Sequence, residues 1–294
     1  MNKPAVLCIG NMKGGVGKTT LSLLITRYLA LKGCSVLLID ADPQGSASMH
    51  CADDELFDEK GIPRVGLHVI IDHIMRSEEG DFPENLTEHV WQVTPVLEEG
   101  FWIIPNAITA SYYDPLLFSQ NLHTVLIRKI IEQISEDMSF DVVVIDSPPY
   151  VNAFSASGLV ASHSLLIPAE AAPISVTSVE VMLKVVGRYK KYGLVPEDML
   201  GEIRVVPTKV RRTRTSLVSV EYLVESFGAL LTSSYLPFSE KINRFYTGAI
   251  TVERLLSEES EFSKKLESLL KEIEEHLIVP FMSERSKRKV LGGK

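Results

Sequence analysis

The sequence predicts a single α/β domain with a mostly parallel, twisted sheet of about eight strands and helices on both of its faces. Short runs of aliphatic and β-branched residues alternate with segments of helical apolar spacing along the whole chain. Several of these runs end in an aspartate or pass into a glycine-rich loop. No linker rich in Gly, Pro or Ser and no internal repeat divides the chain, so one domain accounts for its length.

A glycine-rich loop follows the first apolar run. Residues 6–9 are apolar, residues 13–20 read KGGVGKTT, and residues 21–30 have helical spacing. A strand, such a loop and a helix together bind phosphate, because glycines let backbone N–H groups point inward and the helix adds its dipole. Lys18 is expected to reach the β- and γ-phosphates of ATP and Thr19 to ligate Mg²⁺. The predicted ATP-binding residues of the loop are Lys13, Gly14, Gly15, Val16, Gly17, Lys18, Thr19 and Thr20.

Two further apolar runs end in aspartates. Residues 35–39 are followed by Asp40 and Asp42, and the β-branched run 142–145 is followed by Asp146. The carboxyl ends of parallel strands border the crevice where open α/β sheets bind ligands, so Asp146 is placed to hold Mg²⁺ through water. Pro148 and Pro149 come next and predict a stiff turn, since neither can continue a strand.

The early lysine, Lys13, gives the loop a form that resembles the deviant Walker A loop of the ParA/MinD family of dimerising ATPases. The segment 40–46, DADPQGS, resembles the switch I motif of that family, and 146–149, DSPP, resembles its switch II. The resemblance implies a single P-loop NTPase domain over residues 1–282. It also implies that Lys13 crosses to the nucleotide of a partner subunit, that Asp42 orients the attacking water and that Asp40 lies near the Mg²⁺. The expected catalytic residues are thus Lys13, Lys18 and Asp42, and the expected metal site is Thr19, Asp40 and Asp146.

The later segments resemble the family less closely. By analogy with relatives, Thr208 contributes to the ATP site, and Pro237 and Phe238 flank the adenine. Glu170 stands where many relatives carry glutamine. The elements expected are helices over 67–75, 119–137, 175–191, 216–227 and 258–277, an extended segment over 91–96, and strands over 101–105, 163–168, 203–207 and 230–236, with Ser216 capping its helix.

Charge is distributed unevenly along a chain whose formal net charge is −8. Residues 53–99 carry 13 Asp and Glu against three Lys and Arg, which marks 51–100 as an acidic variable insert. Residues 283–294 form a basic tail that is expected to be flexible. Two loops at one sheet edge hold a cluster that could bind DNA phosphates without reading sequence. The predicted DNA-binding residues are Lys209, Arg211, Arg212, Arg214, Lys241 and Arg244.

The family resemblance implies a function. ATP would assemble a sandwich dimer that binds DNA non-specifically, and slow hydrolysis, stimulated by a ParB-like centromere-binding protein, would release it. The cargo would be a plasmid, a chromosome or a protein cluster, and the location cytoplasmic and nucleoid-associated. Since no helix-turn-helix segment precedes the loop, the chain is similar to the small chromosomal type.

Two alternatives remain open. A MinD-like membrane-cycling ATPase needs an amphipathic basic C-terminal helix, but Pro280 interrupts the apolar segment 277–282, so membrane binding is not expected. A metabolic relative of the cobyrinic-acid amidase kind also remains open, whereas an iron protein does not, because no cysteine follows Cys51.

Cysteine and histidine usage adds no second site. Cys8, Cys34 and Cys51 are sparse and fit a reduced cytoplasm. His68 and His73 lie five residues apart, the wrong spacing for one helical face, so a metal site there is not expected. No apolar run is long enough for a membrane span, and residues 1–4 leave no room for a signal peptide.

Overall fold

One seven-stranded sheet organises the protein. The computed structural model describes residues 3–51, 54–93, 101–172 and 174–291. The strand order is β3-β4-β2-β5-β1-β6-β7, and every neighbouring pair is parallel except β3 and β4. This confirms the predicted α/β class. The strands are β1 Ala5–Ile9, β2 Val36–Asp40, β3 Trp91–Gln92, β4 Phe101–Ile104, β5 Val142–Asp146, β6 Ser164–Glu170 and β7 Glu202–Thr208.

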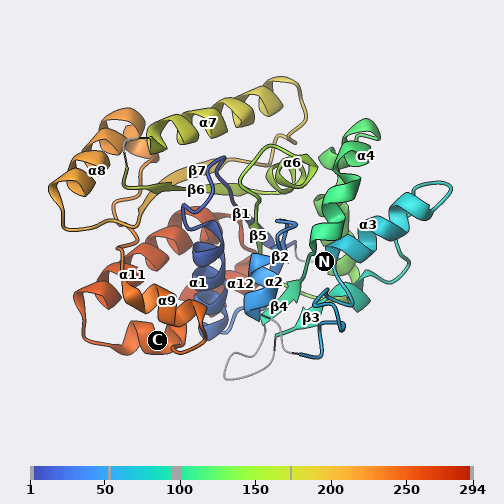
Figure 1. Cartoon of the computed structure of the whole chain (residues 1–294), viewed down its shortest axis with the longest axis horizontal. Helices are drawn as coiled ribbons and strands as arrows, with labels where there is room; N and C mark the ends of the chain where they lie inside the picture. The colour runs from blue at the N-terminus through green and yellow to red at the C-terminus, as the bar shows by residue number, and fades with distance from the viewer. Residues whose placement is uncertain (1–2, 52–53, 94–100, 173, 292–294) are drawn as a thin grey trace.

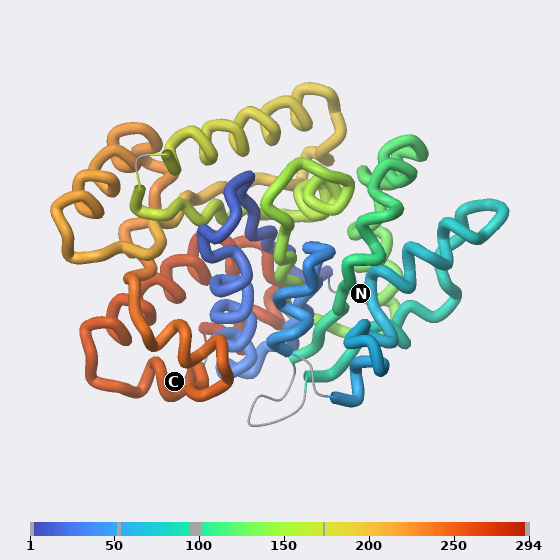
Figure 2. Tube along the Cα trace, viewed as in Figure 1, coloured from blue at the N-terminus to red at the C-terminus, as the bar shows by residue number. Residues whose placement is uncertain are grey.

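Helices cover both faces of the sheet (Figure 1). Helix α1 packs on one face with the C-terminal helices, and the trace beyond residue 240 lies beside α1 in Figure 2. Helices α3 and α5 to α8 cover the other face. The helices are α1 Lys18–Leu31, α2 Ser46–Cys51, α3 Leu67–Arg76, α4 Asp114–Ser119, α5 Leu126–Asp137, α6 Ala153–Val160, α7 Ser175–Lys191, α8 Arg214–Phe227, α9 Glu240–Tyr246, α10 Val252–Ser257, α11 Glu261–Ile273 and α12 Glu284–Leu291.

Alternating side chains of the central strands serve the two faces. In β5, Val142 and Val144 belong to the core under α1, while Val143 and Ile145 belong to the core under α5 and α6. Both sets are fully buried, which explains why this strand reads as a continuous apolar run and not as an alternating one. No helix among the described residues is long and apolar enough to cross a membrane.

Several predicted elements differ from the structure. The strand expected over 230–236 does not form; the segment meets β7 through one isolated bridge, Leu231 to Val205, and through the Thr232 and Leu236 N–H groups, which donate to the Val205 and Pro207 carbonyls at 2.9 Å each. Its Ser233 and Ser234 N–H groups donate to the Glu272 carboxylate at 2.6 and 2.8 Å, so they are not available for a ladder. This accounts for seven strands where about eight were expected.

Helix boundaries also differ. The helix expected over 119–137 is divided, because Asn121 adopts a left-handed conformation (φ 58°) between α4 and α5. The closing helix over 258–277 begins at Glu261 and ends in a π turn at 274–278. Helix α3 confirms the helix expected over 67–75. The extended segment is present at 91–92, whereas residues 94–96 lie outside the described residues.

The basic segment after residue 283 is folded, and the prediction of a flexible tail is wrong for residues 284–291. These residues form α12, whose Val290 is buried in the core beneath α1. Asp141, at the start of β5, accepts hydrogen bonds from Ser286 Oγ at 2.5 Å and from Lys289 Nζ at 2.7 Å. Asp141 also accepts the Ser35 N–H at 2.8 Å. The helix is therefore held by one carboxylate at the amino edge of the sheet. Residues 292–294 lie outside the described residues.

Replacing Asp141 is expected to loosen this attachment. Burial acts to raise the pKa of Asp141, but the hydrogen bonds from Lys289 and Ser286 outweigh it and hold the pKa below its ordinary value. Asp141→Asn should therefore lower the free energy of unfolding by about 1–2 kcal/mol at neutral pH, measured by urea denaturation. The pKa of Asp141 is lower in the folded than in the unfolded protein, so its ionised carboxylate stabilises the fold fully only above the unfolded-state pKa of about 4. The difference from wild type should therefore shrink as the pH falls below about 4. Glu284→Gln, at an exposed residue of the same helix, is the control, and an equal loss in both variants would contradict the assignment.

Candidate nucleotide site

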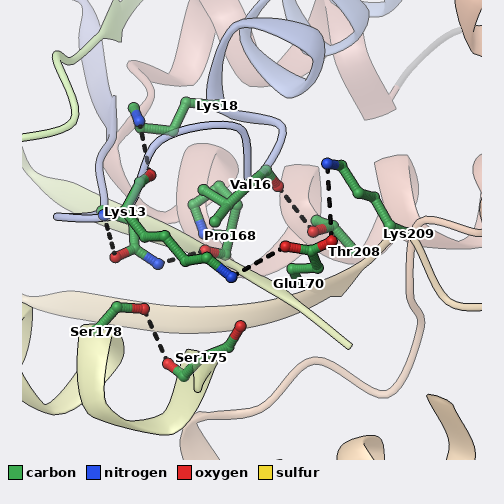
Figure 3. Close-up of polar contacts among 10 residues, drawn as sticks. Lys13, Val16, Lys18, Pro168, Glu170, Ser175, Ser178, Thr208 and Lys209 are labelled. Carbon is green, nitrogen blue, oxygen red and sulfur yellow. Dashed lines mark hydrogen bonds and ion pairs between the residues drawn. The ribbon is translucent and has the colours of Figure 1, made fainter. Parts of the chain in front are cut away.

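The glycine-rich loop adopts the conformation that its sequence predicts. It joins β1 to α1, and Gly15 and Gly17 have φ values of 70° and 96°, a region that other residues rarely enter. Lys18 is the first residue of α1, and its Nζ donates to the Lys13 carbonyl at 3.2 Å (Figure 3). Burial lowers the pKa of Lys18, against the opposing effects of Asp146 and Asp42. Backbone N–H groups, one lysine and a helix N-terminus thus converge where a triphosphate would bind.

Two neighbouring strands hold this loop in place. Asn11 donates through Nδ2 to the Pro168 carbonyl in β6 at 2.6 Å and accepts the Lys13 N–H at 3.2 Å. Thr208, at the end of β7, donates its hydroxyl proton to the Val16 carbonyl at 2.7 Å. Thr208 is fully buried. Thr208 therefore supports the shape of the predicted ATP site by holding the glycine-rich loop. Asn11, for which no role was predicted, holds the same loop against β6.

Asp146 and Asp40 lie on adjacent strands at the same edge of the sheet, as predicted. They are direct register partners in β5 and β2, and both are fully buried. Ser22 Oγ donates to Asp146 Oδ1 at 3.0 Å, while Asp146 Oδ2 is buried without a hydrogen-bond partner among the described residues. Burial raises the pKa of both carboxyl groups, and the charge of Asp146 adds to the effect on Asp40. An unpartnered oxygen on a carboxylate pair beside Thr19 fits a Mg²⁺ site, because hard cations prefer oxygen ligands.

Both carboxylate oxygens of Asp40, which was predicted to lie near Mg²⁺, accept hydrogen bonds from neighbouring residues. Its Oδ2 accepts both the N–H and the hydroxyl of Ser48, at 2.8 and 2.6 Å, and its Oδ1 accepts the Asp42 N–H at 3.2 Å. Ser48 Oγ in turn accepts the Asn106 N–H at 2.9 Å. Asp40 thereby positions the Asp42 segment and the start of α2, and its contact with Mg²⁺ stays a prediction.

Asp42 and the double proline border the same space. Asp42 is nearly buried, and its Oδ1 accepts the Gln44 N–H at 3.0 Å. Burial raises the pKa of Asp42, while that hydrogen bond and the charge of Lys18 oppose the rise. A Cβ on Gly14 would lie 3.9 Å from Pro149, so the Pro148–Pro149 turn packs against the loop. The structure thus brings the predicted Lys18, Asp42, Asp146 and switch II residues together.

The predicted adenine-contacting residues lie beside the end of β7. Val210 and Pro237 form an isolated bridge, and the Phe238 N–H donates to the Val210 carbonyl at 2.9 Å. The Phe238 ring is partly exposed, with the Arg211 guanidinium 3.4 Å above its centre. Arg211 therefore already covers one face of this ring, and only the other is open to a base.

The predicted DNA-binding residues do come from two adjoining segments, but they differ in availability. Arg214 and Arg244 are exposed, and no ion pair is recorded for either within the described part of the chain. Arg212 pairs with Glu261, and Lys241 pairs with Glu258 and is turned toward Ser260. Lys209 lies 3.8 Å from Glu170. Arg211 likewise has no ion pair there and lies over the Phe238 ring, so Arg211, Arg214 and Arg244 are the members of this set without an ion pair in the described part of the chain.

Histidines and cysteines form no second centre. His68 Nε2 contacts the Pro63 carbonyl at 2.9 Å, and His50 Nδ1 contacts the Tyr246 carbonyl at 3.0 Å. Within residues 3–51, 54–93, 101–172 and 174–291, no group of three or more His, Cys, Asp or Glu could hold a metal ion. The three cysteines are buried and free.

Glu170, like Asn11, is a site residue for which the sequence predicted no role. It ends β6, and its carboxylate lies 3.0 Å from the ammonium group of Lys13. The strand order places β6 directly beside β1, which feeds the glycine-rich loop. An acidic residue at the carboxyl end of the next parallel strand was the available signal, but the strand order itself was not.

Comparison with known proteins agrees with this geometry. Residues 4–197 match the family model described as "AAA domain". The chain is 27% identical over 235 residues to the chromosome-partitioning ATPase Soj of Treponema pallidum, covering 79% of this chain and 83% of Soj. It is 26% identical over 221 residues to the maintenance of carboxysome distribution protein A of Synechococcus elongatus, covering 72% and 78%.

A solved structure has the same fold. The ATP complex of a Cyanothece McdA variant aligns with a TM-score of 0.75 and 22% identity, covering 93% of this chain and 97% of that one. At this identity the match establishes the fold. Together with the family model and the glycine-rich loop, these findings show that the chain belongs to the AAA domain family and is a P-loop ATPase of the ParA/MinD type.

Proposed function

We propose that this protein is a ParA-like partitioning ATPase whose ATP-bound sandwich dimer binds DNA non-specifically and comes apart on hydrolysis. One observation carries the proposal: Lys13 stands at the front of the phosphate loop but does not point into it. Its ammonium group extends toward Glu170, away from Lys18 (Figure 3). A lysine so placed could reach a phosphate that a second subunit presents once its contact with Glu170 breaks.

The surface around the loop supports a dimer. Large apolar side chains are exposed on the segments that follow the carboxyl ends of β4, β5 and β6. Ile174 is 68% exposed and Tyr112 is 73% exposed. Clusters of exposed apolar side chains often mark protein interfaces. The set consists of Ile108, Tyr112, Tyr150, Val151 and Ile174.

Hydrolysis would rest on positioning and charge. The loop N–H groups and Lys18 would hold the triphosphate, and Asp42 would orient a water in line with the γ-phosphate. Lys13 of the other subunit would stabilise the charge that develops there, as an arginine finger does in trans. Thr19, Asp146 and, through its neighbours, Asp40 would hold Mg²⁺, which when bound would neutralise phosphate charge. A ParB-like partner with a basic segment would accelerate this slow reaction.

DNA binding would use two exposed arginines, Arg214 at the start of α8 and Arg244 in α9. A dimer carries twice as many of these arginines as a monomer and can therefore make twice as many contacts with DNA phosphates. Because such contacts are electrostatic, the affinity for DNA should fall steeply as the salt concentration rises. The proposed cytoplasmic, nucleoid-associated location follows from this binding. The cargo could equally be a protein assembly; the Synechococcus relative is named for the maintenance of carboxysome distribution.

Removing Arg214 and Arg244 together should weaken DNA retention. We expect the double alanine variant to bind unrelated DNA fragments at least about tenfold more weakly with ATP, with a shallower dependence on salt, because four cations leave each dimer. Filter binding at several salt concentrations measures this. Arg285→Ala with Arg288→Ala, on the exposed side of α12, is the matched control. Equal loss in the two double variants would show that Arg214 and Arg244 are not part of the DNA-binding surface.

The alternative function is that of a MinD-like ATPase, which would cycle on and off a membrane and not on and off DNA. In the structure, Val290 of α12 is buried and only Leu291 offers a large exposed apolar side chain in that helix. Membrane binding would require α12 to leave the domain. Flotation with anionic liposomes and ATP decides between the two functions, since the partitioning ATPase stays with the soluble fraction.

A further inference from the structure

We infer that Glu170 is a positioning residue that holds Lys13 within its own subunit until ATP-dependent dimerisation draws the lysine across the interface. The inference rests on the proposed trans role of Lys13 and extends it by naming what competes with that role. Lys13 Nζ lies 3.0 Å from Glu170 Oε2, and the two side chains are 28% and 32% exposed. Figure 3 shows the Lys13 side chain running along the loop to meet the carboxylate, while Lys18 lies on the other side.

The backbone around this pair is fixed on both sides. The Lys13 N–H and the Pro168 carbonyl are joined through the Asn11 side chain. Glu170 stands at the end of β6, and the Ala171 N–H that follows donates to the Thr208 carbonyl at 2.9 Å. Both ends of the ion pair are therefore held by strands, so that the pairing needs little ordering of the chain.

A second cation shares the carboxylate. Lys209 Nζ lies 3.8 Å from Glu170 Oε1, on the opposite side from Lys13 (Figure 3). Lys209 has a left-handed backbone (φ 53°), which is uncommon for a residue other than glycine. When Lys13 leaves, Lys209 stays next to Glu170, and the carboxylate is not left without a counter-charge. This lowers the cost of releasing Lys13 and makes the contact reversible.

The arrangement predicts the direction of a charge-removing substitution. Glu170→Gln keeps the size of the side chain but removes the attraction for Lys13. A partly exposed ion pair of this kind changes an equilibrium by up to about fivefold. Since a symmetric dimer releases two lysines, the ATP-dependent association constant should rise by about five- to twentyfold. Because the pair is partly exposed, salt should reduce this gain.

The first experiment examines the pair in the nucleotide-free protein, where the proposed function is not involved. Lysine acetylation followed by mass spectrometry measures the reactivity of Lys13. We expect Lys13 to react faster in Glu170→Gln than in wild type, while the exposed Lys184 reacts equally in both. The matched control is Glu202→Gln, which removes a glutamate paired with Arg204 at 3.3 Å at the other end of the neighbouring strand. Equal Lys13 reactivity in all three proteins would overturn the inference.

The second experiment measures dimerisation by sedimentation velocity across ATP concentrations at low and high salt. Glu170→Gln should form dimers at lower ATP than wild type and Glu202→Gln, with the advantage shrinking at high salt. If wild type dimerises with ATP and Glu170→Gln matches it at low salt, Glu170 does not restrain Lys13. If wild type never dimerises with ATP, the proposed function fails, and the acetylation result still decides whether Glu170 holds Lys13.

Discussion

Lys13→Ala is expected to eliminate ATP-dependent dimerisation at micromolar protein while leaving ATP binding nearly unchanged. Loss of one partner of a buried charge pair at an interface weakens it by about 30-fold or more, and a symmetric dimer contains two such pairs. Nucleotide binding survives because Lys18 contacts the carbonyl of residue 13 and not its side chain. Light scattering with ATP gives the dimer content, and a fluorescent ATP analogue gives the affinity.

Two controls make this result specific. Lys184→Ala removes an exposed lysine from α7 and should dimerise as wild type does. Lys18→Ala should lose nucleotide binding itself, because Lys18, buried at the base of the loop, is the residue expected to contact the β- and γ-phosphates. Normal dimerisation of Lys13→Ala with ATP would show that the lysine has no role in trans.

Asp42→Asn is expected to slow hydrolysis by about 100-fold or more while ATP still assembles the dimer, because an amide cannot orient or activate water as a carboxylate does. The amide oxygen can still accept the Gln44 N–H, so the turn should persist. Phosphate release measures hydrolysis, and a lengthened dimer lifetime on DNA measures the trapped state.

Asp58→Asn provides the matched comparison for this variant. Asp58 Oδ1 accepts the Lys60 N–H at 2.8 Å in the same kind of turn, but Asp58 is only half-buried and lies far from the glycine-rich loop in the sequence. The Asp58→Asn variant should hydrolyse ATP at the wild-type rate. A hydrolysis rate for Asp42→Asn close to that of wild type would assign water orientation to another residue.

Local patterns predicted the parts of the site that depend on short stretches of chain. The loop at 13–20 and Asp42 come shortly after the ends of β1 and β2, Asp146 ends β5, and parallel strands place such residues at one edge of the sheet. Their convergence therefore follows from the alternation of strands and helices alone. The pairing of Glu170 with Lys13 could not be predicted in this way, because it depends on β6 lying next to β1 in the sheet.

Tertiary contacts explain the failed predictions. The 230–236 segment has strand-like composition, but two of its N–H groups bind Glu272 of α11, which is distant in sequence. The basic tail lacks an apolar run, yet Asp141 supplies an acceptor for Ser286 and Lys289. The predicted cap Ser216 is not the N-cap of α8; Thr213 is, and Ser216 Oγ accepts the Arg211 N–H. In the first two cases the deciding partner, Glu272 or Asp141, is distant in sequence, whereas the cap of α8 is decided between two residues three positions apart.

The central claim is that ATP controls assembly through Lys13, and sedimentation of the wild-type protein tests it most directly. The protein should sediment as a monomer without nucleotide and with ADP, and as a dimer with ATP, and it should return to the monomer as ATP is hydrolysed. A monomer under all three conditions, or a dimer of equal stability with ADP and ATP, would contradict the account.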